Sequence, residues 1–217
     1  MKILDHAVVA TDSPDVAAVC DAIGAPVEMT SPDHPSGTDR VAEVANLPKY
    51  QDFDLIANVQ GDQPLLEEAH LRSAIDLVRR EGWQVGTCAT PLRTEEARTD
   101  PSVVKVIRAA SGRALYFSRA QIPYMRDGAP TPDDLGRSPF LRHVGIYAYE
   151  RTALHNWVAL APSPLERVEM LEQLRPLEAG LLIGVSVVGE AEPGVDTPAD
   201  ALRMEQQLSR LSHPTPV

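Results

Sequence analysis

The stretch that decides the fold is Asn58-Val-Gln-Gly-Asp-Gln-Pro64, which completes an apolar run that begins at Phe53. The run is short and β-compatible, so it predicts a buried strand. Gly61 permits an abrupt turn of the backbone, and Pro64 keeps the chain from returning to a strand ladder. Asp62 is therefore expected at the carboxyl end of a strand, where open α/β sheets bind ligands. A carboxylate there can hold a hard divalent cation such as Mg²⁺, although a polar turn between strand and helix is the simpler alternative.

Length and composition restrict the class of protein. The 217 residues are enough for one domain with a substantial core. Lysine and arginine number 20 against 31 acidic residues, and the net charge of −11 disfavours nucleic acid and anionic membranes as partners. Cys20 and Cys88 lack metal-ligand spacing, which indicates reduced core thiols of a cytoplasmic protein. Neither a membrane span nor a signal peptide is evident in the sequence. We expect one domain over residues 1–217, with a frayed tail at 210–217.

The first residues predict a strand–helix–strand unit, which is the building block of a parallel sheet. A short apolar strand is expected at His6–Ala10 and a second one at Pro26–Met29. Between them, Ser13 is a good N-cap and Pro14 a good first residue for a helix that ends near Ile23.

A polar loop over Thr30–Arg40 leads into a helix that we expect to begin near Thr38. Small residues and a glycine before a helix N-terminus expose backbone N–H groups, which suit anions or the edge of a base. An ordinary capped loop is the alternative.

The remaining chain alternates apolar strands with helical patterns. Alternation over Arg142–Tyr149 places His143, Gly145 and Tyr147 on one face of a strand. The other strands are expected at Val85–Leu92, at Leu181–Val188 and in a hairpin of Val103–Ala109 with Arg113–Phe117. The helices are expected at Leu66–Glu81, Arg151–Leu160 and Pro164–Leu174, the last with a core stripe of Leu165, Val168, Leu171 and Leu174, and from Pro198 onward.

The segment Ser118–Pro139 differs from the rest of the chain, because it carries four prolines, two glycines and mixed charge. Such a composition predicts an extended arm that covers a site or exchanges with a partner subunit. A disordered insertion is the alternative.

Seven motifs stand in order along the chain, and together they carry a resemblance. They are Val9-Ala-Thr-Asp12, His34-Pro-Ser-Gly-Thr-Asp-Arg40, Asn58-Val-Gln-Gly-Asp62, Leu115-Tyr-Phe-Ser-Arg119, Leu141-Arg-His-Val-Gly-Ile-Tyr147, Ser163-Pro-Leu-Glu-Arg-Val-Glu-Met-Leu-Glu-Gln-Leu-Arg175 and Gly194-Val-Asp-Thr-Pro198. The chain resembles the 3-deoxy-manno-octulosonate (KDO) cytidylyltransferase family, the CMP-KDO synthetases of lipopolysaccharide biosynthesis, over roughly residues 5–209.

This resemblance implies a three-layer α/β fold of the nucleotide-diphospho-sugar transferase type, with a mainly parallel sheet. It also implies a homodimer to which the hairpin and the arm contribute. The expected reaction joins KDO to CTP and releases pyrophosphate, with Mg²⁺ held by Asp62 and Asp196. Such a cation can lower the pKa of the attacking hydroxyl and stabilise the charge that develops on the α-phosphate.

The family's ligand positions can be carried over to matching residues of this chain. Those implied for CTP are Thr11, Asp12, Ser36, Gly37, Asp39 and Arg40. Those implied for KDO are Gln60, Tyr116, Ser118, His143, Tyr147, Glu172 and Gln173, a set rich in the donors and acceptors that a polyhydroxylated ligand needs. Without that context, Arg40 would be read as an exposed salt bridge, His143 as a half-buried core histidine, and the pair Glu172 and Gln173 as a solvated helix face.

Two departures from the family pattern matter. Gln63 stands where members often carry glutamate, which removes a negative charge beside Asp62. The family's first strand and its basic triphosphate-binding loop, a unit of about 30 residues with its helix, have no counterpart before Asp5. An upstream start of the protein is the favoured explanation, and a truncated chain or an inactive homologue are the others.

Three functions therefore stay open alongside the expected one. The chain could be a ligand-binding or partner subunit without turnover, or a cytidylyltransferase for another sugar acid such as sialic acid. A glycosyltransferase is a weaker reading, because its usual Asp-x-Asp metal motif is represented here by Gly61-Asp62-Gln63 with one aspartate.

Overall fold

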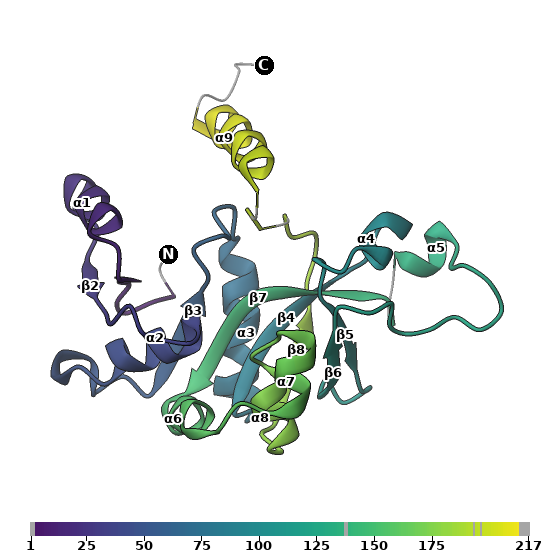
Figure 1. Cartoon of the computed structure of the whole chain (residues 1–217), viewed down its shortest axis with the longest axis horizontal. Coiled ribbons are helices and arrows are strands. Elements are labelled where there is room, and N and C mark those ends of the chain that lie inside the picture. Colours follow the sequence, from purple (N-terminus) through teal and green to yellow (C-terminus); the bar gives the residue numbers. More distant parts are fainter. Residues whose placement is uncertain (1–2, 137–138, 193, 196, 213–217) are drawn as a thin grey trace.

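The computed structural model describes residues 3–136, 139–192, 194–195 and 197–212 (Figure 1). The strands are β1 (Val9–Thr11), β2 (Val27–Met29), β3 (Leu55–Val59), β4 (Val85–Pro91), β5 (Lys105–Arg108), β6 (Ala114–Ser118), β7 (Leu141–Glu150) and β8 (Ile183–Val187). The α-helices are α1 (Pro14–Ile23), α2 (Gly37–Ala45), α3 (Glu68–Glu81), α4 (Glu95–Thr99), α5 (Pro132–Leu135), α6 (Arg151–Ala159), α7 (Pro164–Glu169), α8 (Leu174–Glu178) and α9 (Pro198–Ser212). None of the helices in these ranges combines the length and the apolar character that crossing a membrane requires.

The main sheet is organised around β7. This strand pairs antiparallel with β4 along one edge, and with β3 and the start of β5 along the other. On the far side of β4 lies β8, which runs parallel to it, and β6 pairs with β5 to complete the predicted hairpin. Because β3, β4 and β8 share one direction and β7 opposes them, the sheet is mixed, and the predicted α/β class is confirmed.

Helices cover both faces of this sheet, as predicted for a three-layer domain. On one face, Leu71, Ala74, Ile75 and Val78 of α3 pack with Val144, Ile146 and Ala148 of β7. On the other face, Ala42 and Ala45 of α2, Trp157 of α6 and Leu174 of α8 pack with Tyr147 and Tyr149 of β7. The alternation predicted for β7 is thus confirmed, because a strand sends successive side chains to opposite faces.

One predicted helix is interrupted. The segment expected as a single helix over Pro164–Leu174 ends as α7, because Met170 adopts a left-handed conformation with φ of 52°. The predicted core stripe is therefore only half right: Leu171 and Leu174 are buried, whereas Val168 is 82% exposed.

The arm and the tail contain more helix than expected. Within the arm of residues 118–139, Thr131 caps the short helix α5, with Pro132 at its first position and a capping box completed by Asp134. Outside the arm, α4 was not predicted. In the tail, α9 continues to Ser212, so residues 210–212 are helical rather than frayed, and residues 213–217 lie outside the described residues.

The strands β1 and β2 form a separate parallel pair, which Figure 1 shows beside the main sheet. Between β1 and β3 lies an apolar pocket of about 270 Å³, lined by β3, by Val41 and Val44 of α2, by Leu71 and Ile75 of α3, and by residues 3–8. In the described part of the chain neither β1 nor β3 pairs with another strand on the edge that faces this pocket. The absence of one of the family's strands from this sheet stays a prediction.

Lys105 offers a test of how the arm is attached. The side chain is fully buried, and its Nζ donates to the carbonyls of Asp100, Val103 and Arg119 at 2.9, 2.6 and 2.7 Å. Lys105→Met leaves these acceptors without their donor, so we expect the free energy of unfolding in urea to fall by about 2–3 kcal/mol. Lys49→Met, which removes an exposed lysine paired with Glu28, is the control and should change it far less. Equal losses in the two variants would contradict the assigned role of Lys105.

Candidate active site

The end of β3 places two of the predicted side chains. Gln60 lies over Gly145 of β7, where an added Cβ would meet Gln60 Oε1 at 3.1 Å. A glycine at position 145 therefore leaves the space that the glutamine side chain occupies. Asp62 is half-buried in the turn that follows, as its position after a buried strand predicted.

The chain returns to Asp62 from far along the sequence. The backbone N–H of Val195 donates to the Asp62 carbonyl at 2.9 Å, and a Cβ added at Gly194 would lie 2.9 Å from Asp62 Oδ2. These contacts bring residues 194–195 to the predicted metal position. Asp196 itself lies outside the described residues, so its predicted role as a metal ligand stays a prediction.

A Mg²⁺ ion would fit the chemistry of this place. The Asp62 carboxylate is of the hard-oxygen type that Mg²⁺ prefers, and glycine at 194 leaves room beside it that any side chain would fill. In the described residues no group of three or more His, Cys, Asp or Glu side chains forms a complete metal site. An ion held here would therefore depend on Asp62, on Asp196 as the resemblance implies, and on oxygens of a bound ligand.

The start of α2 gathers most of the residues predicted for CTP. Ser36 is the N-cap: its Oγ accepts from the Asp39 N–H at 3.3 Å and donates to Asp39 Oδ2 at 2.6 Å. Arg40 forms an ion pair with Asp12 at 3.0 Å and also donates to Thr30. Gly37 is exposed, and Thr11 at the end of β1 accepts a hydrogen bond from the Ser13 N–H. The structure thus brings the β1 and α2 positions together.

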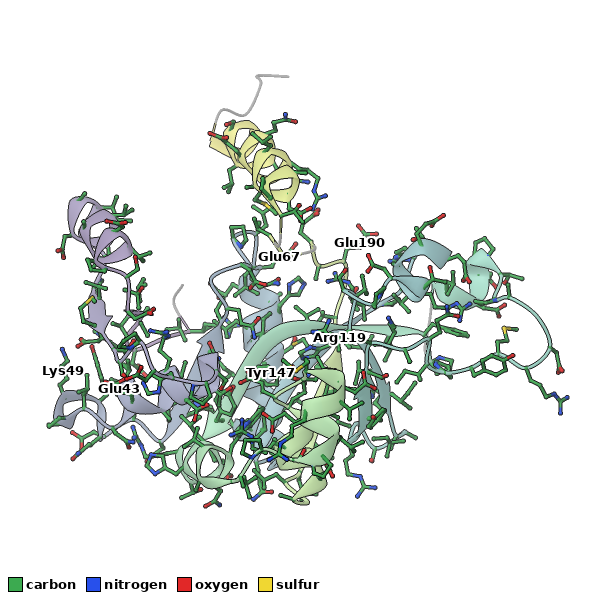
Figure 2. All side chains as sticks on the ribbon, in the orientation of Figure 1. Glu43, Lys49, Glu67, Arg119, Tyr147 and Glu190 are labelled. Carbon is green, nitrogen blue, oxygen red and sulfur yellow. The ribbon has the colours of Figure 1, made fainter. Side chains whose placement is uncertain are left out.

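Two of the positions predicted for KDO are held by a residue to which the sequence had assigned no role. Glu169 accepts hydrogen bonds from Ser118 Oγ at 2.6 Å, from the Arg119 N–H at 2.9 Å and from Tyr116 Oη at 3.4 Å. Arg119, at the base of the arm in Figure 2, donates in turn to the Glu169 carbonyl. The signal that could have found Glu169 is its place in the Ser163–Arg175 motif, three residues before Glu172.

The face of β7 that carries His143 and Tyr147 is closely packed. The His143 ring meets Phe117 edge-on at 5.1 Å and lies 5.4 Å from the ring of Tyr147, which is central in Figure 2. His143 Nε2 lies 3.0 Å from Thr87 Oγ1, which donates its own hydrogen to the Ile146 carbonyl. The ring nitrogen must therefore donate to Thr87. Burial, with help from neighbouring Arg142, lowers the pKa of His143 to about 3, so the ring is neutral near pH 7.

Glu172 and Gln173 lie between α7 and α8, not on a solvated helix face. Gln173 is buried, and Glu172 Oε1 accepts a hydrogen bond of 3.0 Å from Thr38 Oγ1. Burial raises the pKa of the Tyr147 phenol above its usual range, and its neighbours Tyr149 and Glu172 add to that rise. Thr38 stood in a quoted motif, but its side chain had been given no role.

The fold and these positions define a class. The family of cytidylyltransferases matches this chain over residues 1–183, and the chain belongs to that family. A solved inositol-1-phosphate CTP transferase from T. maritima, 14% identical, shares the fold with a TM-score of 0.62 over 97% of this chain and 77% of its own.

Within that class the relatives point to one group, as the seven motifs predicted. The 3-deoxy-manno-octulosonate cytidylyltransferase of Gemmatimonas aurantiaca is 50% identical over 204 residues, which is 94% of this chain and 78% of that protein. The protein of the same name from Methylococcus capsulatus is 44% identical over 210 residues, 93% of this chain and 80% of its own. A solved CMP:2-keto-3-deoxy-manno-octonic acid synthetase complexed with CTP is 36% identical, with a TM-score of 0.82 over 94% of this chain and 80% of that one.

His143 predicts how stability depends on pH. Its pKa in the folded chain, about 3, is lower than that of an unfolded histidine, about 6.5, so between these values the unfolded chain binds more protons. The contribution of His143 to the free energy of unfolding is therefore complete above pH 6.5 and is lost as the pH falls. His143→Gln should remove up to about 1.4 kcal/mol per pH unit from the slope between pH 4.5 and 6.5, as measured by urea unfolding. Parallel curves for the two proteins would show that His143 is not held neutral.

Proposed function

We propose that this chain is a KDO cytidylyltransferase, which couples KDO to CTP to give CMP-KDO and pyrophosphate for lipopolysaccharide biosynthesis. Membership of the cytidylyltransferase family supports nucleotide chemistry, and the relatives that bear this name cover most of the chain. The observation that carries the proposal is the meeting of Asp62 with residues 194–195, beside strands that hold the predicted sugar positions. It joins the two motifs that the proposed metal site requires.

In this reaction the anomeric hydroxyl of KDO attacks the α-phosphorus of CTP. A new O–P bond forms, the bond between the α- and β-phosphates breaks, pyrophosphate leaves, and the hydroxyl proton passes to solvent. Catalysis of this kind consists mainly of alignment and charge neutralisation. Mg²⁺, when held by Asp62 and Asp196, would supply a Lewis acid for the phosphate oxygens.

The residues of the chain divide this work. The segment Ser36–Arg40 offers the N-terminus of α2 to the nucleotide, and backbone groups near Gly37 can read the edge of the cytosine. Gln60, His143 and Tyr147 present polar groups from neighbouring strands to the sugar acid. Since His143 stays neutral and donates to Thr87, it is suited to orienting the site and not to carrying a positive charge.

Asp62→Asn is the direct test. Loss of the carboxylate should lower Mg²⁺-dependent pyrophosphate release from CTP and KDO by at least about 100-fold, because a metal ligand acts on the transition state. Asp52→Asn, an exposed aspartate ten residues earlier, is the matched control and should retain turnover. Full activity of Asp62→Asn would reject the metal role, and absence of turnover in the unaltered chain would count against the enzyme.

A second candidate, binding of nucleotide and sugar without turnover, has one observation in its favour. The guanidinium of Arg40, the cationic side chain of the proposed CTP segment, is already engaged by Asp12 and Thr30. Calorimetric binding of CTP without pyrophosphate release would favour this candidate. Competition among KDO, sialic acid and other sugar acids would decide the specificity.

We also propose a cytoplasmic homodimer. The free, buried thiols of Cys20 and Cys88 support a reducing compartment. The arm leaves the body of the domain in Figure 1, and Tyr124 on it is 81% exposed, while Leu115 of the hairpin is 45% exposed. Large apolar side chains exposed on projecting elements are typical of association surfaces.

The dimer is testable by light scattering. The unaltered chain should have twice the mass of one chain, and Tyr124→Glu combined with Leu115→Glu should shift it to the monomer mass, because charges replace apolar contacts. Val19→Glu, at an exposed apolar position of α1, is the control and should stay dimeric. A monomeric unaltered chain would reject the dimer, and a dimeric double variant would reject the arm and hairpin as its interface.

A further inference from the structure

A buried polar contact links two parts of the site that the proposed function keeps separate. Thr38, the second residue of α2, has no exposed surface, and it donates from Oγ1 to Glu172 Oε1 at 3.0 Å across 134 residues of sequence. Thr38 lies inside the segment proposed for the nucleotide, whereas Glu172 is proposed for the sugar acid. A single hydrogen bond therefore joins the two ligand regions.

The second oxygen of Glu172 is incomplete within the protein. In the part of the chain that the structure describes, Glu172 Oε2 and Tyr147 Oη are both buried and have no hydrogen-bond partner. Leaving buried polar atoms of this kind unsatisfied is costly, and in native sites they are normally completed by a ligand or by ordered water. One oxygen of the carboxylate is thus held by Thr38, and the other is available to a polar group of a ligand.

The contact also extends toward β3. In the described residues Asn58 Nδ2 and Tyr149 Oη are also buried without a hydrogen-bond partner, and Asn58 pairs with Tyr147 in the ladder between β3 and β7. Asn58 precedes Gln60 by two residues on the strand that ends at Asp62. Because α2 also contacts β3, Thr38 lies on the helix that joins β3 to the segment between α7 and α8.

From this arrangement we propose that Thr38 is a positioning residue that couples nucleotide binding to sugar-acid binding through Glu172. The inference rests on the proposed function, because that function assigns the two ligands to the two segments. A nucleotide bound at Ser36–Arg40 would fix the first turn of α2 and with it the Thr38 hydroxyl. The hydroxyl then holds Glu172 Oε1, so that Oε2 is presented to the hydroxyl groups of the sugar acid. Coupling of this kind is reciprocal, so each ligand strengthens binding of the other by the same factor.

A purely structural role for Thr38 makes a different prediction. If its hydrogen bond only stabilised the fold, its loss would lower the unfolding temperature. It would also weaken the binding of each ligand by the same factor whether or not the other ligand was bound. The coupling factor between the two ligands would not change. That factor is therefore the quantity to measure.

The experiment is calorimetric titration of KDO into the full chain with Mg²⁺, with and without the α,β-methylene analogue of CTP, whose carbon bridge resists pyrophosphate release. In the unaltered chain we expect the analogue to tighten KDO binding about fivefold or more. Thr38→Val keeps the size of the side chain and removes the hydroxyl, so the gain should fall to less than about twofold. Thr38→Ser keeps the hydroxyl and should keep the full gain in KDO affinity.

Equal gains in the unaltered chain and in Thr38→Val would overturn the inference, as would the absence of any gain in the unaltered chain. Should Thr38→Val fold poorly, Thr38→Ala removes the same hydroxyl and must also abolish the gain. Pyrophosphate release, measured separately, distinguishes the two proposals. Turnover without coupling rejects only the role of Thr38, and coupling without turnover rejects only the proposed reaction.

Discussion

The hydrogen bonding of β7 on both of its edges is the constraint on which the rest of the structure depends. The strand spans Leu141–Glu150 and holds β4 on one side and β3 with β5 on the other. Its alternation sends Tyr147 and Tyr149 to one core and Val144, Ile146 and Ala148 to the other. Because β3 is held against it, Gln60 after the end of β3 lies over Gly145, which shares a face of β7 with His143. The candidate site is a consequence of this register, since a slip by one residue would exchange the two faces.

Local signals were sufficient for much of the fold. Ser13 with Pro14 marked the start of α1, and the helix ends as expected at Ile23, with Gly24 in the left-handed conformation as its C-cap. The apolar spacing in α3 identified the face that packs on β7, because a buried helical stripe has a period that few other structures share. Strand order was not accessible in this way: periodicity reports which face is buried, and it does not report which strand lies alongside. The antiparallel placement of β7 within the sheet is a property of the tertiary structure.

The site residues also divide into those that local signals predicted and those that depend on the tertiary structure. The motif around Asp62 predicted a carboxylate after a strand, and the return of residues 194–195 to it was expected only through the resemblance. The roles of Glu169 and Thr38 were missed for a physical reason. A helical pattern through Pro164–Leu174 would have carried Glu169 and Glu172 on a continuous helix, whereas Met170 in the left-handed region turns the chain there. An acidic residue on a solvated face and one that closes a buried polar cluster look identical in sequence.

The pocket between β1 and β3 has a consequence for the distribution of stability within the domain. The β1–β2 pair shares no backbone ladder with the main sheet in the described residues, and α2 contacts both β1 and β3. Local unfolding can therefore open the β1–β2 end at a lower free energy than the sheet around β7, where the neighbouring strand β4 is buried along almost its whole length. The two proposed ligand regions would then belong to cooperative units of unequal strength. A nucleotide bound at the β1–β2 end would rigidify this less stable unit, and its lower conformational entropy would influence ligand binding elsewhere in the domain.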